Sequence, residues 1–354
     1  MSEHDERARF ERAVHDAFGA AVRIVAVTAL HGDASSRRYV RLTLAGPAPA
    51  SAVVMVLGEG RFAPGSDELG TGSVGAELPF VNVARWLGAH DFPVPRIHLD
   101  RARDDGLLLL EDVGNTTLWA SVSADPRKTL ALFGQAVDLL ARLQVAGATP
   151  DSTCVAFGRR FDAGLARAEL AHYVDHGVET RHGVALASAE RAELLALLEP
   201  LVPPFENGPC TLSHRDYMAW NIHVRDDELV LIDFQDALIA PDAFDLAQLL
   251  TDRTTIERVD ATLEASLIAR FEAARRGAGL PVPPGFEDRY RRCALQHALK
   301  VIGRFYLLEV VKKKPGYLAY LPAVYAVGRH MLRALPDLAP AIPSLARWTP
   351  ELAP

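Results

Sequence analysis

Residues 212–236 read LSHRDYMAWNIHVRDDELVLIDFQD, and three side chains of this segment suit phosphoryl transfer. Asp216 can accept a proton from a substrate hydroxyl, Asn221 can offer an amide oxygen to Mg²⁺, and Asp233 can hold the same ion through its carboxylate. A polar turn at residues 225–228 lies between two short apolar runs and predicts a β-hairpin. The hairpin would bring Asn221 and Asp233 to the same end, as a shared metal site requires.

A structural interpretation of the same residues stands beside the functional one. Asp216 and Asp233 can cap loops, and Asn221 can fill a turn; a lone His-x-Asp would favour that interpretation. The full pattern is His-Arg-Asp, four residues, Asn, an apolar strand and Ile-Asp-Phe, which favours function. Phosphoryl transfer leaves little covalent chemistry to the protein, so a metal, a base and fixed positions are what the residues must supply.

The bulk properties indicate a globular protein of two domains or lobes. The chain has 354 residues, 49% of them hydrophobic, and a mean hydropathy of +0.06. A net charge of −7 and a pI near 6.0 argue against a general nucleic-acid binder. No apolar run approaches the roughly 20 residues of a membrane helix, and the acidic start is unlike a signal peptide. Three widely spaced cysteines fit neither a disulfide framework nor a zinc site, so we expect reduced thiols and a cytoplasmic location, with the oligomeric state open.

Strand signals gather in the first third of the chain, and helical periods dominate after it. The predicted elements of the first part are a helix within 3–20, strands at 22–30, 39–44 and 52–57, a mobile Gly-rich loop at 58–75, a helix from Pro79 and a buried strand at 107–110. We therefore expect an α+β fold. Its small β-rich N-terminal lobe would be residues 1–113, and its large, mainly α-helical C-terminal lobe, residues 114–354, would carry the chemistry.

Two segments of the first part can contact a nucleotide. Gly32, Ser35 and Ser36 lie between two predicted strands, where backbone and hydroxyl groups can reach phosphate oxygens. An ordinary hairpin turn explains these residues equally well. Glu111 to Val113 follow the buried strand and form a connector whose peptide groups can hydrogen-bond an adenine edge. A simple interlobe linker is the alternative there.

The chain resembles a known superfamily in Ser213–Asp216, Asn221, Ile232–Phe234 and Asp245–Ala247. These motifs are similar to those of the aminoglycoside phosphotransferase and choline kinase superfamily, relatives of protein kinases. A closer resemblance is to the anomeric kinases of cell-wall recycling, which phosphorylate the 1-hydroxyl of N-acetylmuramate and N-acetylglucosamine. That resemblance comes from residues 32–39, 110–114, 214–217, 233–237, 300–305 and 314–318. The similarity covers about residues 22–330.

The resemblance implies a protein kinase-like bilobal fold and an ATP- and Mg²⁺-dependent small-molecule kinase. It implies these roles: Asp216 as catalytic base, Asn221 and Asp233 as metal ligands, Gly32 to Arg38 as the phosphate-covering loop, Glu111 to Val113 as the adenine-facing connector, and Asp245 as a brace for the catalytic loop.

The sequence departs from the superfamily pattern at two places. Members commonly grip the phosphates with a third-strand Lys, but residues 52–57 contain none and the first Lys is Lys128. We expect Arg37 or Arg38 to replace it, because Arg offers a fixed fork of donors to phosphate. Met218 stands where we expect His in the sugar-kinase relatives.

The acceptor is the least defined part of the prediction. Asp236, Arg304 and Tyr317 are the candidates for binding an amino sugar, with surface ion pairing and helix packing as alternative roles. An aminoglycoside or choline-like acceptor would favour an acidic pocket, whereas a lactyl-bearing sugar would favour a nearby Arg or Lys, and both kinds of residue are present. A nucleotide-binding module that has lost catalysis is a further alternative. The missing Lys motivates it, and the retained Asp216, Asn221 and Asp233 speak against it.

Overall fold

The computed structural model describes residues 3–30, 37–58 and 77–353, which divide into two compact units. The first unit comprises Met1–Asn115 together with His223–Asp236, and the second comprises Thr116–Ile222 together with Ala237–Pro354. The predicted Gly32, Ser35 and Ser36, and nearly all of the Gly-rich loop at 58–75, lie outside the described residues. The lobe division expected after residue 113 stays a prediction.

The first unit is built on a five-stranded antiparallel sheet with the strand order β1-β2-β3-β5-β4. Its strands are β1 (Arg23–Leu30), β2 (Arg38–Ala45), β3 (Ser51–Val56), β4 (Ile97–Arg101) and β5 (Leu107–Glu111). β5 is an interior strand between β3 and β4, and all of its apolar residues are buried, which explains its continuous run of leucines.

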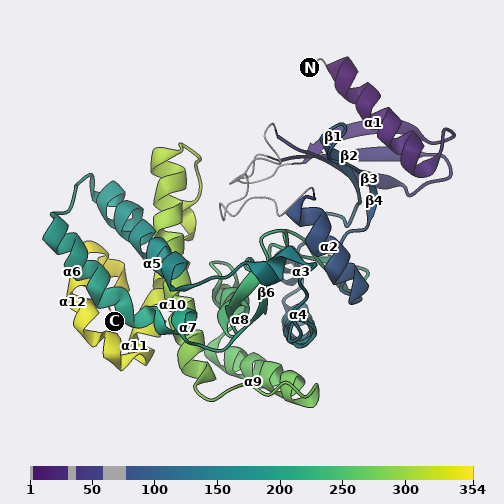
Figure 1. The fold of residues 1–354 in the computed structure, drawn as a ribbon. Coiled ribbons are helices and arrows are strands. Elements are labelled where there is room, and N and C mark those ends of the chain that lie inside the picture. Colours follow the sequence, from purple (N-terminus) through teal and green to yellow (C-terminus); the bar gives the residue numbers. More distant parts are fainter. Residues whose placement is uncertain (1–2, 31–36, 59–76, 354) are drawn as a thin grey trace. The chain divides into compact units, whose positions relative to one another are not determined.

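Helix α1 (Glu3–Phe18) packs against the sheet of the first unit, as Figure 1 shows. Phe10 and Val14 on the helix meet Val40 and Leu42 on β2, and each of these side chains is at most 1% exposed. Phe10 and Val14 are four residues apart and therefore share one face of the helix, and Val40 and Leu42 are two residues apart and share one face of the strand. This packing defines the apolar core of the unit.

The hairpin predicted between the two candidate metal ligands is present. Its strands are β7 (Ile222–Arg225) and β8 (Glu228–Leu231), which pair as a two-stranded sheet. Leu231 N donates to Pro93 O at 2.7 Å, and Arg225 forms a 2.7 Å ion pair with Glu111 at the end of β5. These contacts connect the hairpin to the segment between α2 (Pro79–Ala89) and β5 in the first unit.

The second unit is mainly helical. Its helices are α3 (Leu118–Ala124), α4 (Thr129–Ala146), α5 (Ala163–His172), α6 (Ser188–Leu198), α7 (Pro203–Glu206), α8 (Phe244–Thr251), α9 (Ala261–Gly277), α10 (Phe286–Tyr306), α11 (Leu321–Ala334) and α12 (Ile342–Trp348). Short 3₁₀ segments lie at 126–128, 155–158, 199–201, 255–257, 318–320, 336–341 and 350–352, and strands β6 (Cys210–Ser213) and β9 (Leu238–Pro241) pair antiparallel.

Helix α10 is the central element of the second unit and contacts α5, α8 and α11 (Figure 1). Two π-helical segments, η3 (Tyr173–Thr180) and η6 (Leu307–Val311), continue α5 and α10 and contact each other. Gly303 on α10 permits the close approach of α10 to α5, because a Cβ at this position would lie 2.6 Å from His172 O. Every helix in the described part of the chain is too short or too polar to cross a bilayer. The predicted α+β class, a strand-rich part followed by a helical part, is confirmed.

Candidate functional site

The segment after β6 is held by one buried carboxylate from α8. Asp245 accepts hydrogen bonds from Ser213 Oγ at 2.7 Å, His214 N at 2.7 Å and Arg215 N at 3.1 Å. Burial raises the pKa of Asp245, whereas the neighbouring His214 and these hydrogen bonds act in the opposite direction. Asp245 therefore fixes the backbone directly before Asp216, which is the role that the resemblance implied for it.

The side chains on either side of Asp216 are buried, and Asp216 itself is partly exposed. Arg215 has a left-handed backbone with φ of 75°, an unfavourable conformation for a residue with a Cβ. Tyr217 is fully buried, and its hydroxyl donates to Ala136 O at 2.7 Å. The backbone of Asp216 is thus held from both sides while the residue as a whole stays partly exposed.

Asn221 closes a tight turn that begins at Asp216. Met218 N donates to Asp216 O at 3.0 Å, and Asn221 N donates to Met218 O at 2.9 Å. Asn221 Nδ2 also donates to Asp216 O at 3.0 Å, so the amide oxygen lies on the other branch of the side chain. The structure thereby brings two of the predicted site residues, Asp216 and Asn221, together within the second unit.

Asp233 belongs to the first unit and lies two residues after β8. It is exposed, and its φ of 63° is again left-handed. Gln235 Nε2 donates to Asp233 Oδ1 at 2.9 Å and to Asp236 Oδ2 at 3.2 Å. The ring of Phe234 stacks on Phe80 of α2 with centroids 4.9 Å apart, which anchors the turn. Asn221 directly precedes β7 but belongs to the second unit, and a metal site that it shares with Asp233 stays a prediction.

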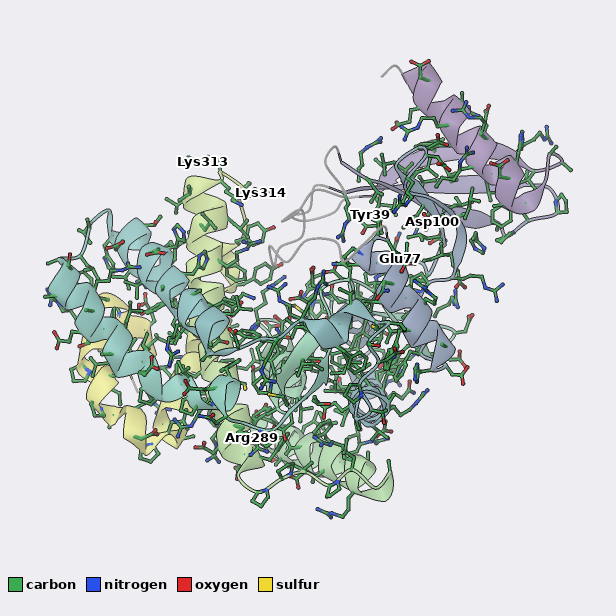
Figure 2. All side chains as sticks on the ribbon, in the orientation of Figure 1. Tyr39, Glu77, Asp100, Arg289, Lys313 and Lys314 are labelled. Carbon is green, nitrogen blue, oxygen red and sulfur yellow. The ribbon has the colours of Figure 1, made fainter. Side chains whose placement is uncertain are left out.

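Tyr39, whose place on β2 is shown in Figure 2, is affected electrostatically by two of the predicted residues, Arg37 and Asp233. Burial raises the pKa of its phenol, the positive charge and a hydrogen bond of Arg37 lower it, and the negative charge of Asp233 raises it. Arg37 and Asp233 are therefore both close enough to Tyr39 to act on its hydroxyl. Arg38 instead forms an ion pair with Glu6 on α1. Sequence reasoning missed Tyr39, although it directly follows the two arginines.

The predicted adenine-facing connector is well ordered by side-chain contacts. Glu111 N donates to Arg96 O at 2.8 Å, and the Glu111 carboxylate accepts from Arg96 N at 3.1 Å. Burial opposes ionisation of Glu111, yet these bonds and the Arg225 pair lower its pKa overall. Asp112 forms a two-pronged ion pair with Arg41, and Val113 is 8% exposed. Their part in nucleotide binding stays a prediction.

The three predicted acceptor residues lie in different surroundings. Asp236 is buried in the first unit beside Gln235, whereas Arg304 and Tyr317 belong to the second. Arg304 is in the last turn of α10; burial, followed by the charges of His176 and Arg304, lowers the pKa of His172 to about 4. Tyr317 packs beside Phe305, with ring centroids 5.6 Å apart. Their joint contact with a substrate stays a prediction.

Asp233 and Asn221 each carry the kind of oxygen donor that a hard cation prefers. In the described part of the chain, no three His, Cys, Asp or Glu side chains form a metal-binding cluster. An exposed carboxylate and an oriented amide oxygen nevertheless match Mg²⁺, which takes one or two protein oxygens and completes its shell with phosphate oxygens and water. The residues therefore fit a metal that enters with a nucleotide.

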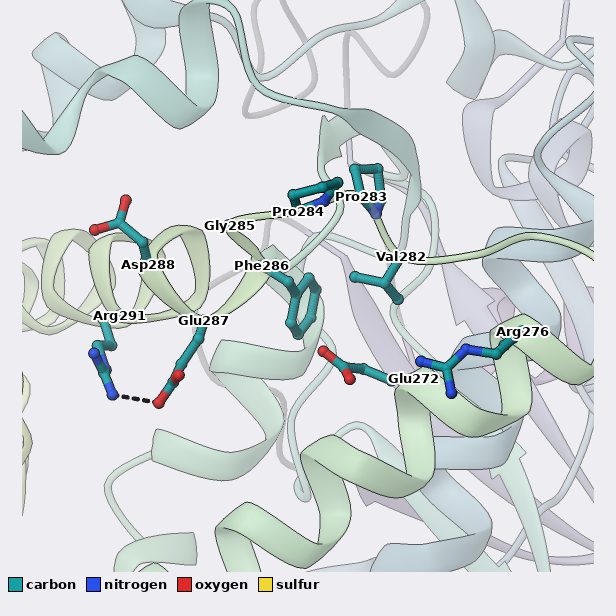
Figure 3. A pocket seen from close by; sticks show the side chains of 10 residues that line it. All are labelled: Glu272, Arg276, Val282, Pro283, Pro284, Gly285, Phe286, Glu287, Asp288 and Arg291. Atoms are coloured by element: carbon teal, nitrogen blue, oxygen red, sulfur yellow. Dashed lines mark hydrogen bonds and ion pairs between the residues drawn. The ribbon is translucent and has the colours of Figure 1, made fainter.

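A separate hollow of about 480 Å³ lies where α9 approaches the start of α10 (Figure 3). Acidic and basic side chains, including Glu272, Arg276 and Arg291, line it with Val282 and Phe286. It contains none of the predicted site residues. Nearby, Arg289 (Figure 2) forms two hydrogen bonds of 2.8 Å with buried Asp242, which is a structural pair. Size alone therefore does not make this hollow the catalytic site.

The model of the phosphotransferase enzyme family matches residues 26–285. The N-acetylmuramate/N-acetylglucosamine kinase of Pseudomonas aeruginosa is 32% identical over 270 residues, which are 74% of this chain and 75% of that protein.

Two solved structures share the fold. A choline/ethanolamine kinase family protein from Mesorhizobium loti has 13% identity and a TM-score of 0.58, over 96% of this chain and 99% of that one. An ADP-bound aminoglycoside phosphotransferase has 12% identity and a TM-score of 0.58, over 92% of this chain and 97% of that one. Both agree with the predicted α+β, kinase-like fold.

Proposed function

Since this chain belongs to the phosphotransferase enzyme family, we propose that it transfers the γ-phosphoryl group of ATP to the anomeric hydroxyl of N-acetylmuramate or N-acetylglucosamine. The observation that carries the proposal is the braced turn from Ser213 to Asn221, which contains a partly exposed Asp216 and an oriented Asn221 amide. The name of the 32% identical relative supports the choice of acceptor, and the ADP-bound structural neighbour supports a nucleotide as the phosphoryl donor.

Asp216 is the base in this proposal. It accepts the proton of the sugar hydroxyl while the oxygen forms its bond to the γ-phosphorus and the bond from that phosphorus to ADP breaks. Fixed orientation matters more than basicity here, because a carboxylate is a weak base and the transfer depends on alignment. The contacts of Asp245 with Ser213, His214 and Arg215 supply that orientation.

Asp233 and Asn221 would hold Mg²⁺ together with phosphate oxygens of the nucleotide. The ion would offset the negative charge of the triphosphate. We assign Arg37, rather than Arg38, to the phosphate-binding role of the missing Lys, because Arg37 acts on Tyr39 with Asp233 while Arg38 pairs with Glu6. Glu111 to Val113 would face the adenine, and the segment Gly32 to Arg38 would cover the phosphates. Asp236, Arg304 and Tyr317 keep their proposed contact with the acceptor.

The proposed setting is the cytoplasm, with a nucleotide and a small amino sugar as the only partners required. Cys154, Cys210 and Cys293 are free thiols, as a reducing compartment favours.

A panel of acceptors with ATP tests the proposal. We expect turnover with N-acetylmuramate and N-acetylglucosamine, phosphate on the anomeric oxygen by ³¹P NMR, and loss of turnover when Mg²⁺ is chelated. Asp216→Asn, with its fold checked by circular dichroism, should be inactive. Turnover of an aminoglycoside or choline in place of the sugars would overturn the acceptor. Nucleotide binding without turnover of any acceptor would favour a catalytically inactive module.

A further inference from the structure

An arginine in the second unit lies within a group of aromatic rings. The guanidinium carbon of Arg253 is 4.9 Å from the ring centroid of Tyr320, 5.4 Å from that of Phe305 and 5.8 Å from that of Trp220. Its side chain is only 17% exposed. Ring faces attract a cation and hold the plane of the guanidinium, but they do not accept its N–H groups in strong hydrogen bonds. The rings thus orient the guanidinium group of Arg253 but accept no hydrogen bonds from its N–H groups.

The nearest carboxylate does not satisfy these donors either. Arg253 Nη1 is 3.9 Å from Asp252 Oδ1, beyond hydrogen-bond distance. Asp252 Oδ2 accepts instead from Thr254 Oγ1 at 3.1 Å. The buried Nε of Arg253 has no hydrogen-bond partner among the residues that the structure describes. Because Nε is buried, an anionic oxygen from outside can reach only Nη1 and Nη2, which likewise make no hydrogen bond among the described residues.

The arginine segment is attached directly to the catalytic turn. Trp220 Nε1 donates to Thr254 Oγ1 at 3.1 Å, one residue from Arg253. Trp220 itself directly precedes Asn221, inside the turn that begins at Asp216. Trp220 and Tyr320 are both partly exposed. A ligand that contacts Trp220 therefore contacts the turn that holds the proposed base.

The combination of groups selects one class of ligand. Aromatic rings stack on the C–H faces of a sugar, and a guanidinium pairs with a carboxylate through two parallel hydrogen bonds. We propose that Arg253 is a specificity residue that binds the carboxylate of an acidic amino sugar, with Trp220 and Tyr320 against the sugar. This inference rests on the proposed function and assigns to Arg253 the preference between its two acceptors for the one that carries a carboxylate. A cationic acceptor would meet the like charge of Arg253.

The test compares two sugars that differ in this group, N-acetylmuramate with its lactyl carboxylate and neutral N-acetylglucosamine. In the full-length protein, Arg253→Gln should raise KM for N-acetylmuramate at least tenfold and leave KM for N-acetylglucosamine within twofold. Arg253→Lys should fall between, because it keeps the charge and loses the fork. Arg258→Gln is the matched control. Arg258 also lies over a ring, 5.9 Å from the centroid of Trp119, and has a buried Nε without a partner among the described residues.

Binding without ATP, measured by calorimetry, separates this inference from the proposed function. If the unaltered protein phosphorylates neither sugar but binds N-acetylmuramate through Arg253, the kinase proposal fails and this inference stands. If the affinities for both sugars fall equally in Arg253→Gln, or if neither affinity changes, Arg253 is structural and the inference is wrong. An equal loss of N-acetylmuramate affinity in Arg258→Gln would also overturn it, because the effect would then not depend on the position of Arg253. Absence of both turnover and binding would overturn both proposals.

Discussion

The turn at 213–221 and the turn at 233–236 carry the proposed catalytic residues but are stabilised in different ways. In the first, a fully buried Asp245 accepts three hydrogen bonds from consecutive residues. In the second, exposed Asp233 sits in a left-handed turn at the end of a hairpin and contacts Gln235. The base is thus positioned by side-chain hydrogen bonds, and the metal ligand by the course of the backbone.

This difference separates function from stability. A substitution in the buried network removes acceptors from groups that cannot reach water, so it must affect folding as well as alignment. A substitution at the exposed carboxylate removes a charge that the fold does not need. Each turn therefore has its own experimental signature.

The largest expected effect is on turnover, when the two carboxylates are changed in turn. Asp216→Asn should lower kcat by about 10²–10⁴-fold, since a general base is lost. Asp233→Asn should also lower it strongly, but excess Mg²⁺ should restore part of the activity in this variant alone, because only its defect is in metal affinity. Steady-state kinetics across a Mg²⁺ titration measure both. Equal rescue of the two variants would contradict the separate roles.

A smaller effect, on stability, should distinguish the brace from the ligand. Asp245→Asn should lower the free energy of unfolding by about 3 kcal/mol, because one amide oxygen cannot replace two carboxylate oxygens facing three donors. Asp233→Asn should change it by less than about 0.5 kcal/mol. Urea denaturation of both variants gives the comparison. A stable Asp245→Asn protein would show that the network does not hold the turn.

The hairpin and the proximity of Asp216 to Asn221 could be predicted from the sequence, because both depend on local patterns. The sequence could not place β5 between β3 and β4, since strand order depends on long-range pairing. Tyr39 and Arg253 were missed for the same reason. The role of Tyr39 depends on Asp233, which is distant in the chain, and the ring contacts of Arg253 come from residues 220, 305 and 320.

The smallest expected effect is the response of the first turn to acid. His297 is fully buried, and burial, with the charges of Lys300 and Arg253, lowers its pKa to about 3. It lies 3.5 Å from Gln248, whose oxygen accepts from Tyr217 N at 3.2 Å. A folded pKa below the unfolded one means that stability is complete above about pH 6.5 and is lost as the pH falls toward 3.

As the pH falls from 7 to 5, protonation of this histidine in the unfolded chain should lower the free energy of unfolding by about 2 kcal/mol. His297→Gln should therefore lose less stability over that interval than the unaltered protein does, as measured by urea midpoints at both pH values. Identical losses would show that His297 is not the titrating group.

The division of the first unit into residues 1–115 and 223–236 has a consequence for synthesis of the chain on the ribosome. The sheet can pair once β5 has emerged, but the hairpin that adjoins it through Arg225 and Leu231 is translated more than a hundred residues later. The unit is complete only after Asp236 has left the exit tunnel. A nascent chain stopped before that point carries an incomplete unit, and a gene fragment that ends at residue 115 encodes only part of it.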